Sequence, residues 1–144
     1  LSSVQGAILH HWRVRLERSN KTRTENGAYF RDGLNGLRPE GEGIPYLRFP
    51  ILAGNRKERD EIYARSNKEG LGVSLMYPKG IHQIDEISER FRGSAFPLAE
   101  RVAERLIAMP THQYVSSKDR ELLKALISRT LGTGAASSCM PGLR

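Results

Sequence analysis

The sequence predicts an α+β fold in which a small antiparallel-type sheet has helices packed on one side. Apolar residues recur at helical spacing in three segments, two apolar runs bounded by glycine or proline are typical of strands, and the connections are short. With 144 residues and 38% hydrophobic content, the chain suffices for one compact domain. We do not expect two full domains.

A long amphipathic helix is the first predicted element. Its apolar stripe has four-residue spacing and consists of Val4, Ile8, Trp12 and Leu16. Residues 17–27 are almost wholly polar before apolar residues return, so either one helix crosses solvent or two helices meet near Gly27. We favour a continuous helix and assign residues 1–38 to it.

A loop rich in glycine and proline leads to the first predicted strand, residues 46–53. Asn55, with Glu58 three residues later, has the form of a helix N-cap and its reciprocal partner. A helix therefore begins there. Gly70 is expected to end it.

The second predicted strand spans residues 71–77. Pro78 is expected to stop it, because proline has no N–H to donate to the ladder. Residues 78–94 form the longest irregular segment, and long loops beside strand ends often carry function.

Two helices and a short extended segment complete the pattern. Apolar spacing over residues 98–106 predicts a helix with Pro97 in its first turn, where a missing N–H costs little. Residues 109–115 are expected to be extended. Ser116 and Asp119 cap the last helix, whose apolar face contains Leu122, Leu123, Leu126 and Ile127.

The expected organisation is thus an interdomain-type helix over residues 1–38, a small domain over residues 39–131 and a mobile tail over residues 132–144. No apolar segment is long enough for a membrane helix, and a signal peptide is not evident, so we expect a cytoplasmic chain. The single cysteine, Cys139, allows neither a disulfide framework nor a thiolate metal cluster within one chain.

The net charge of +7 raises the question of nucleic acid or another polyanion as partner. Cations concentrate near the amino terminus at Arg13, Arg15, Arg18, Lys21 and Arg23. Acidic residues are interspersed through most of the remaining chain, so a solvated helix face is the favoured interpretation and nucleic acid the less favoured one. A free-standing basic interaction module remains the alternative function, and steep weakening of binding by salt would support it.

Motifs that carry chemistry are mostly missing. The sequence has no phosphate-binding glycine loop with its lysine, no HExxH, no GxSxG and no CxxC. His10 and His11 are adjacent on a helix and point in different directions, which disfavours joint metal binding. His82 is the better candidate, because it follows a strand end together with Tyr77, a phenol that can hydrogen bond, and Lys79, a point charge for an anion. A structural role for His82 is the alternative.

Several spaced motifs resemble the carboxy-terminal part of the DegT/StrS-type sugar aminotransferases, pyridoxal-phosphate enzymes of fold type I. The motifs are YLRFP at residues 46–50, GVSLMYPKGIH at 72–82, FPLAE at 96–100 and MPTHQ at 109–113. The amino-terminal LSSVQGAIL is similar to the family's M-S-x-I-Q-A-A segment. The order and spacing agree over nearly the whole chain, although Met109 replaces leucine, Gln113 replaces proline and residues 79–81 differ.

This resemblance implies transfer of an amino group, usually from glutamate, to a keto sugar carried on a nucleotide, as in polysaccharide biosynthesis. It also implies that this segment closes over a large domain and, in a homodimer, helps to form the substrate side of the cleft. His82 and Tyr77 would orient sugar hydroxyls or a phosphate, Lys79 would add charge, and Arg48 is a weaker candidate whose alternative is a strand-surface role. In a chain without the large domain, Val4, Ile8 and Trp12 would be exposed to solvent, so we also expect copies of the chain to associate with one another.

The same resemblance places the family's Schiff-base lysine and its other cofactor-binding residues in the large domain. The lysines of this sequence are Lys21, Lys57, Lys68, Lys79, Lys118 and Lys124, and none has the serine-rich context of that lysine. We therefore expect no catalytic residue, no bound cofactor and no activity in this chain alone, and we expect a fragment or truncated reading frame. A decayed gene product is a further alternative.

Overall fold

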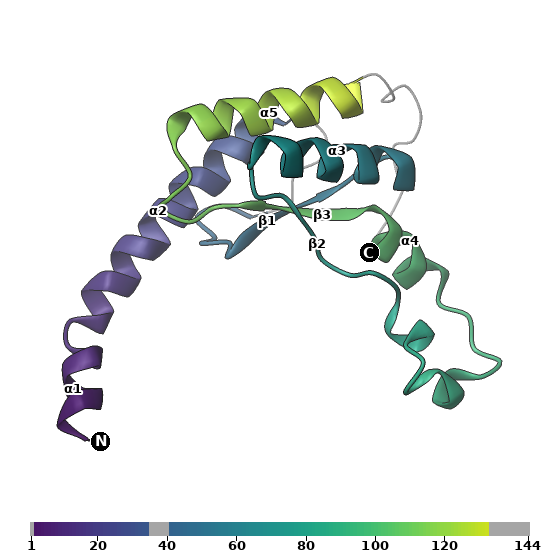
Figure 1. Ribbon diagram of the computed structural model, residues 1–144, viewed down its shortest axis with the longest axis horizontal. Helices are drawn as coiled ribbons and strands as arrows, with labels where there is room; N and C mark the ends of the chain where they lie inside the picture. The colour runs from purple at the N-terminus through teal and green to yellow at the C-terminus, as the bar shows by residue number, and fades with distance from the viewer. Residues whose placement is uncertain (1, 35–40, 133–144) are drawn as a thin grey trace.

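A three-stranded antiparallel sheet lies at the centre of the molecule (Figure 1). The computed structural model describes residues 2–34 and 41–132. The strand order is β1-β3-β2, and the strands are β1 (Arg48–Leu52), β2 (Ser74–Leu75) and β3 (Leu106–Pro110). The last strand in the sequence is thus the central one, which confirms the predicted α+β class.

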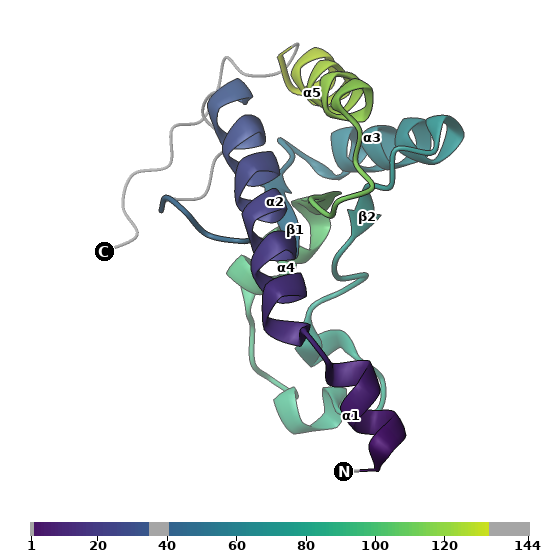
Figure 2. The same cartoon turned by 90° about the vertical axis from the view of Figure 1, so that its left-hand side faces the viewer.

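The described part of the chain also forms five α-helices and two short 3₁₀ helices. They are α1 (Ser3–Leu9), α2 (Trp12–Gly33), α3 (Arg56–Glu69), η1 (Ile81–Gln83), η2 (Ser88–Phe91), α4 (Pro97–Arg105) and α5 (Ser117–Gly132). Figures 1 and 2 show α2, α3 and α5 gathered on one side of the sheet. No helix in the described ranges combines the length and the apolar character that crossing a membrane requires.

The core forms where these three helices meet one face of the sheet. Phe49 pairs with Met109 and Ile51 with Ile107 across β1 and β3, so alternate residues of both strands point to the same face. Each of these side chains is at most 1% exposed. The helices add Phe30, Ile62, Leu123 and Ile127. Burying one such side chain contributes about 1.5–3 kcal/mol, so this face supplies most of the cohesion of the domain.

The amino-terminal helix continues through Gly27, as predicted, but it is not one helix from the start of the chain. Gly27 is buried within α2, and an added Cβ would lie 3.5 Å from the ring of Tyr46. The predicted continuity is wrong at residues 10–11, where α1 ends and His11 takes a left-handed backbone with φ 59°. A residue in this conformation interrupts the helical hydrogen bonds.

The predicted start and stop signals of α3 and α5 are confirmed. Asn55 Oδ1 accepts a hydrogen bond from the Glu58 amide at 3.0 Å, and Glu58 Oε2 accepts one from the Gly54 amide at 2.9 Å. Gly70 ends α3 in the left-handed region with φ 67°. Ser116 and Asp119 exchange the corresponding contacts before α5.

The predicted bounds of the other two strands need correction. The strand predicted over residues 71–77 pairs only at Ser74–Leu75, so the ladder ends before Pro78 is reached. The extended segment predicted over residues 109–115 is β3, which begins at Leu106, a residue that the sequence placed on the preceding helix. Apolar spacing in the sequence does not define where a ladder starts and stops, so these bounds follow from the residues of β2 and β3 that pair in the fold.

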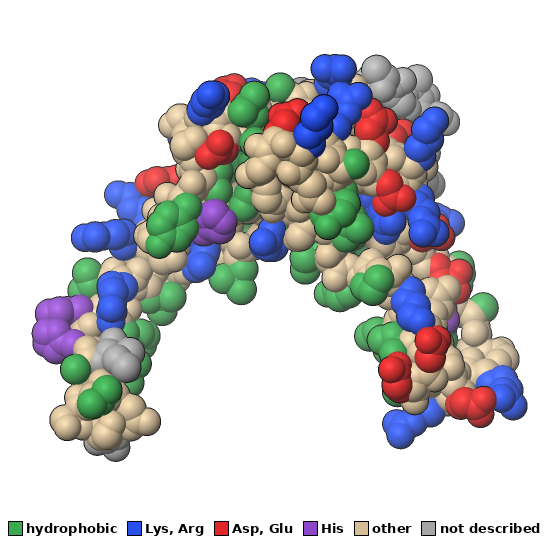
Figure 3. All heavy atoms as spheres, viewed as in Figure 1, with side chains coloured by type: hydrophobic (Ala, Val, Ile, Leu, Met, Phe, Trp, Pro, Cys, Tyr) green, Lys and Arg blue, Asp and Glu red, His purple; other side chains and the backbone are tan. Residues whose placement is uncertain are grey.

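The described part of the molecule has the shape of an arch (Figures 1 and 3). We call α1 with the beginning of α2 the first arm, and the 78–94 segment with α4 the second arm. The predicted interdomain-type helix corresponds to the first arm and its extension onto the sheet. The predicted tail from residue 133 onward, like residues 35–40, lies outside the described residues.

Candidate functional site

The residues that the sequence singled out lie in two different parts of the molecule. Tyr77, Lys79 and His82 follow β2 and begin the second arm. Arg48 opens β1 opposite Pro110, at the end of β3 that lies away from the departure of β2. At about 3.4 Å per residue, the strand register separates Arg48 from Tyr77 by most of the length of the sheet. The structure therefore groups three of the four candidates.

Arg48 braces the sheet. Its Nη1 donates to the Gly72 carbonyl at 3.0 Å, which ties the start of β1 to the chain entering β2. This contact matches the strand-surface role that the sequence left open for Arg48.

Tyr77 and Lys79 are the accessible members of the group. Tyr77 is 51% exposed, so its side chain is accessible from solvent. The Lys79 ammonium lies 3.1 Å from Asp85 Oδ1, and both side chains are solvated. Such an exposed pair contributes little to stability and leaves the ammonium available to an incoming anion.

His82 is held more firmly than either neighbour. Its Nε2 lies 2.9 Å from Glu100 Oε1, and its side chain is only 11% exposed. The imidazole centre lies 5.0 Å from that of Phe96, which in turn meets Phe91 edge-on at 5.8 Å. The histidine is thus enclosed between its own turn and the beginning of α4.

Sequence reasoning did not assign a site role to Glu100 or Phe96. Both belong to the FPLAE motif, whose Pro97 opens α4 and whose Glu100 lies in the first helical turn. A carboxylate there is favoured by the helix dipole. The FPLAE motif was the signal that could have pointed to Glu100. The contact between Glu100 and His82 spans 18 residues, however, and depends on how the loop folds back.

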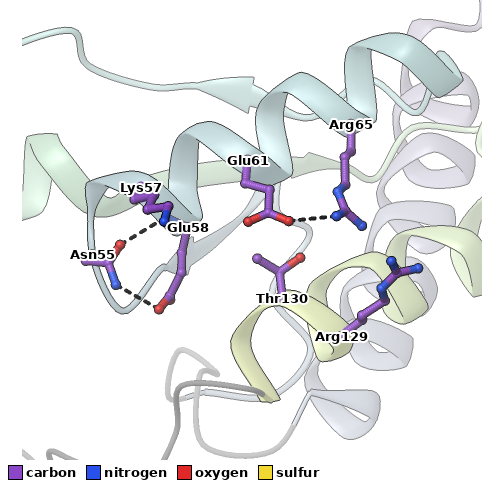
Figure 4. Close-up of a pocket in the computed structure, with 7 residues that line it drawn as sticks. All are labelled: Asn55, Lys57, Glu58, Glu61, Arg65, Arg129 and Thr130. Carbon is purple, nitrogen blue, oxygen red and sulfur yellow. Dashed lines mark hydrogen bonds and ion pairs between the residues drawn. The ribbon is translucent and has the colours of Figure 1, made fainter.

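A separate hollow of about 420 Å³ lies between α3 and α5 (Figure 4). It is lined by Asn55, Lys57, Glu58, Glu61, Arg65, Arg129 and Thr130. Its carboxylates are already engaged, since Glu58 caps α3 and Glu61 pairs with Arg65 at 2.8 Å. The hollow is on the helix layer, apart from the second arm, so we place the candidate site at residues 77–82 instead.

The first arm carries cations of the amino-terminal group, but their described contacts are local and do not form a ligand-binding site. Arg13 lies over the ring of Trp12 with its guanidinium 5.4 Å from the ring centre, and Arg15 donates to the His10 carbonyl at 2.8 Å. The rings of His10 and His11 meet edge-on with centres 3.8 Å apart. Within the described ranges, no three His, Cys, Asp or Glu side chains are placed to hold a metal ion.

The fold and the site together define a class of protein. A small antiparallel sheet carries a long helix at its start and a polar loop beyond its edge strand. This arrangement is that of a small α+β domain whose polar loop is accessible beside the sheet.

The family model for the DegT/DnrJ/EryC1/StrS aminotransferases matches residues 1–126. The chain belongs to this family, whose members are pyridoxal-phosphate-dependent aminotransferases. No curated protein matches the chain.

Solved structures agree with this assignment. A DegT/DnrJ/EryC1/StrS aminotransferase from Brucella abortus is 21% identical, with a TM-score of 0.70 over 92% of this chain and 36% of its own. The putative sugar aminotransferase Spr1654 from Streptococcus pneumoniae, in its PMP form, is 17% identical, with a TM-score of 0.68 over 83% and 33%. The aminotransferase TlmJ from Streptoalloteichus hindustanus is 25% identical, with a TM-score of 0.66 over 85% and 34%. The chain spans about a third of the length of these structures.

The described residues do not fit pyridoxal phosphate. A Schiff base requires a lysine amine inside a closed site, whereas none of the six lysines is buried. The least exposed is Lys124, whose amine lies over the ring of Tyr29 at 5.5 Å. We derive no chemical step through the cofactor from these residues.

Proposed function

We propose that this chain is the carboxy-terminal, small-domain portion of an aminotransferase that transfers an amino group from glutamate to a keto sugar carried on a nucleotide. The family match over residues 1–126 carries the proposal. The sugar aminotransferase Spr1654 among the similar structures supports the substrate class. The lack of a buried lysine supports assigning the cofactor to another part of a longer protein.

In this proposal the 78–94 segment contributes to the substrate side of the cleft. The Tyr77 hydroxyl can donate to or accept from a sugar hydroxyl. The Lys79 ammonium can meet a nucleotide phosphate by exchanging its exposed contact with Asp85. His82 presents an imidazole of restricted orientation, and Arg48 acts mainly by bracing the sheet.

The partner in this proposal is the large domain of the same enzyme. Figure 3 shows hydrophobic side chains along the inner sides of both arms of the arch. Exposed apolar residues of the first arm include Val4 at 68% and Trp12 at 48%, and those of the second arm include Ile81 at 65% and Leu98 at 63%. Apolar side chains this exposed, on two arms that face each other, suit a surface that another domain covers in a homodimeric enzyme.

The experiment that tests the proposal begins with the gene upstream of Leu1. An in-frame extension of roughly two hundred residues, a common domain size, should contain a lysine-centred cofactor motif. The extended protein is then assayed with glutamate and keto sugar nucleotides, beside the 144-residue chain as the control. We expect 2-oxoglutarate release from the extended protein only.

Two results would contradict the proposal. Activity of the 144-residue chain with added pyridoxal phosphate would show that the cofactor site is within it. An extended protein that binds the cofactor yet transfers no amino group to any keto sugar nucleotide would remove the substrate assignment. For the site residues, His82→Ala in the extended enzyme should raise KM or lower turnover, and unchanged constants would remove His82 from the site.

A further inference from the structure

The 78–94 segment has few polar links to the rest of the molecule. Within the described ranges its hydrogen bonds close local turns, for example from the Gly80 amide to Gln83 Oε1 at 3.0 Å and from the Ser88 hydroxyl to the Asp85 carbonyl at 3.1 Å. The contact of His82 with Glu100 is the exception among those contacts. Among the described hydrogen bonds, this pair links the segment to α4, beside the ring contacts of His82 and Phe91 with Phe96.

The orientation of His82 reverses the usual preference for apolar burial. Ile81 is 65% exposed, whereas the adjacent His82 side chain is 11% exposed. An imidazole is turned inward in preference to an isoleucine only when a partner compensates its lost hydration. Glu100 is that partner, at 2.9 Å.

Two sides of the imidazole are occupied. Nε2 meets Glu100, and the Cε1–Nδ1 side lies close to Gly80, where an added Cβ would be 2.7 Å from Cε1 and 2.9 Å from Nδ1. Phe96 packs near the ring from the start of α4. The ring therefore has little freedom to rotate while the Glu100 contact persists.

The chemistry of the pair also determines where the proton lies. An ionised carboxylate only accepts hydrogen bonds, so Nε2 must carry the proton that the pair shares. In the neutral imidazole this leaves Nδ1 as the acceptor, and a carboxylate partner is a common way to select one tautomer.

We propose that Glu100 is a positioning residue: it holds His82 in one orientation and one tautomer, and thereby clamps the 78–94 segment onto α4. The description of this segment as a substrate loop rests on the proposed function. The clamp itself is a property of the 144-residue chain. In this proposal, His82 of the GVSLMYPKGIH motif and Glu100 of the FPLAE motif act together to hold the segment in place.

Amide hydrogen exchange of the 144-residue chain tests the clamp. We expect amides of residues 78–94 to exchange about tenfold faster in Glu100→Ala, a factor that corresponds to ~1.4 kcal/mol. Glu104→Ala is the matched control, because Glu104 is an exposed glutamate one turn further along α4. Exchange in β3 is followed in parallel, so that general unfolding is recognised.

Two histidine variants separate the clamp from an effect of Glu100 on its own helix. His82→Leu keeps the carboxylate in α4 but removes the donor, and we expect it to accelerate loop exchange as Glu100→Ala does. His82→Gln places an amide donor near the position of Nε2, and should restore much of the protection. Loop exchange that stays as slow in Glu100→Ala and His82→Leu as in Glu104→Ala would overturn the proposal.

Imidazole nitrogen NMR gives a second readout that simple packing would not change. In the wild-type chain, neutral His82 should be protonated at Nε2, and Glu100→Ala should mix the two tautomers. A predominant Nδ1–H form in the wild-type chain would also overturn the proposal. Neither measurement needs cofactor or substrate, so a failed clamp and a failed aminotransferase assignment are distinguishable.

Discussion

Asn26 is a polar side chain that connects three elements at the centre of the fold. It is 3% exposed on α2, and its Nδ2 donates to the Thr111 carbonyl at 3.0 Å. Its Oδ1 accepts from Arg120 Nη1, at the start of α5, at 3.2 Å. The Asn26 amide thus provides a hydrogen-bond donor for the carbonyl that follows β3 and an acceptor for the guanidinium of α5, in a region where water has little access.

We expect Asn26→Ala to lower the free energy of unfolding by about 2–3 kcal/mol, because the Thr111 carbonyl and the Arg120 guanidinium lose their buried partner. Urea denaturation measures the effect. Asn20→Ala on the same helix is the control, and its half-buried side chain should cost at most about 0.5 kcal/mol. Equal losses in both variants would show that the buried amide has no special role.

Gly80 is a second position where one residue decides local structure. Its buried Cα lies against His82, and any side chain would come within 2.7 Å of the imidazole. The ring cannot yield without leaving Glu100.

Gly80→Ala should therefore destabilise the second arm by about 1–2 kcal/mol through overpacking. A double-mutant cycle with His82→Ala tests the cause, because the alanine at position 80 should cost almost nothing once the ring is absent. The readout is the free energy of local opening from amide exchange. Additive costs in the double variant would exclude the ring as the source of strain.

At the scale of elements, the start of α5 illustrates how a local cap couples stability to pH. Ser116 donates from both its hydroxyl, at 2.7 Å, and its amide, at 2.9 Å, to Asp119 Oδ2. These hydrogen bonds, the side-chain bond first, lower the pKa of the Asp119 carboxyl below its ordinary value. The ionised carboxylate is therefore favoured in the folded state.

The sign of the pH effect follows from this lowered pKa. The contribution of Asp119 to stability is present above the ordinary aspartate pKa, and it is lost as the pH falls through the lowered pKa of the folded state. We expect Asp119→Asn to reduce the acid-side slope of stability against pH, measured by urea denaturation over a pH series. An unchanged slope in Asp119→Asn would contradict the assignment.

At the scale of the whole molecule, the arch leaves large apolar side chains exposed on the first arm. Val4, Leu9, Trp12, Val14 and Leu16 are each at least 46% exposed. They belong to a helical region that the proposed large domain would cover. Without that cover, association between copies of the chain is the expected way to remove them from water.

We expect the 144-residue chain to self-associate in sedimentation velocity, with a concentration-dependent average mass. The double variant Trp12→Ser and Leu16→Ser should weaken association at least about tenfold, because each buried large apolar side chain contributes about 1.5–3 kcal/mol. Tyr114→Ser is the control, since Tyr114 is 80% exposed in the turn before α5 and is not part of the first arm. A monomer at all concentrations would contradict this expectation.

Much of the fold was predictable because its signals are local. The caps at Asn55 and Ser116 and the stop at Gly70 each involve residues at most four positions apart, so their energies are contained in short windows of sequence. The α+β class followed from the periodicity of apolar residues. The family resemblance, which the family model confirms, rested on spaced motifs in a fixed order.

The tertiary structure decided what depends on contacts between distant residues. Leu106 lies on a strand because β1 and β2 both pair with β3, which overrides the helical spacing around it. Asn26 and Thr111 meet across 85 residues, and His82 finds Glu100 only because the loop folds back on α4. By itself, then, the sequence determined the elements, their caps and the family. Strand order and the partner of His82 depended on packing, whose energies arise only when the elements meet.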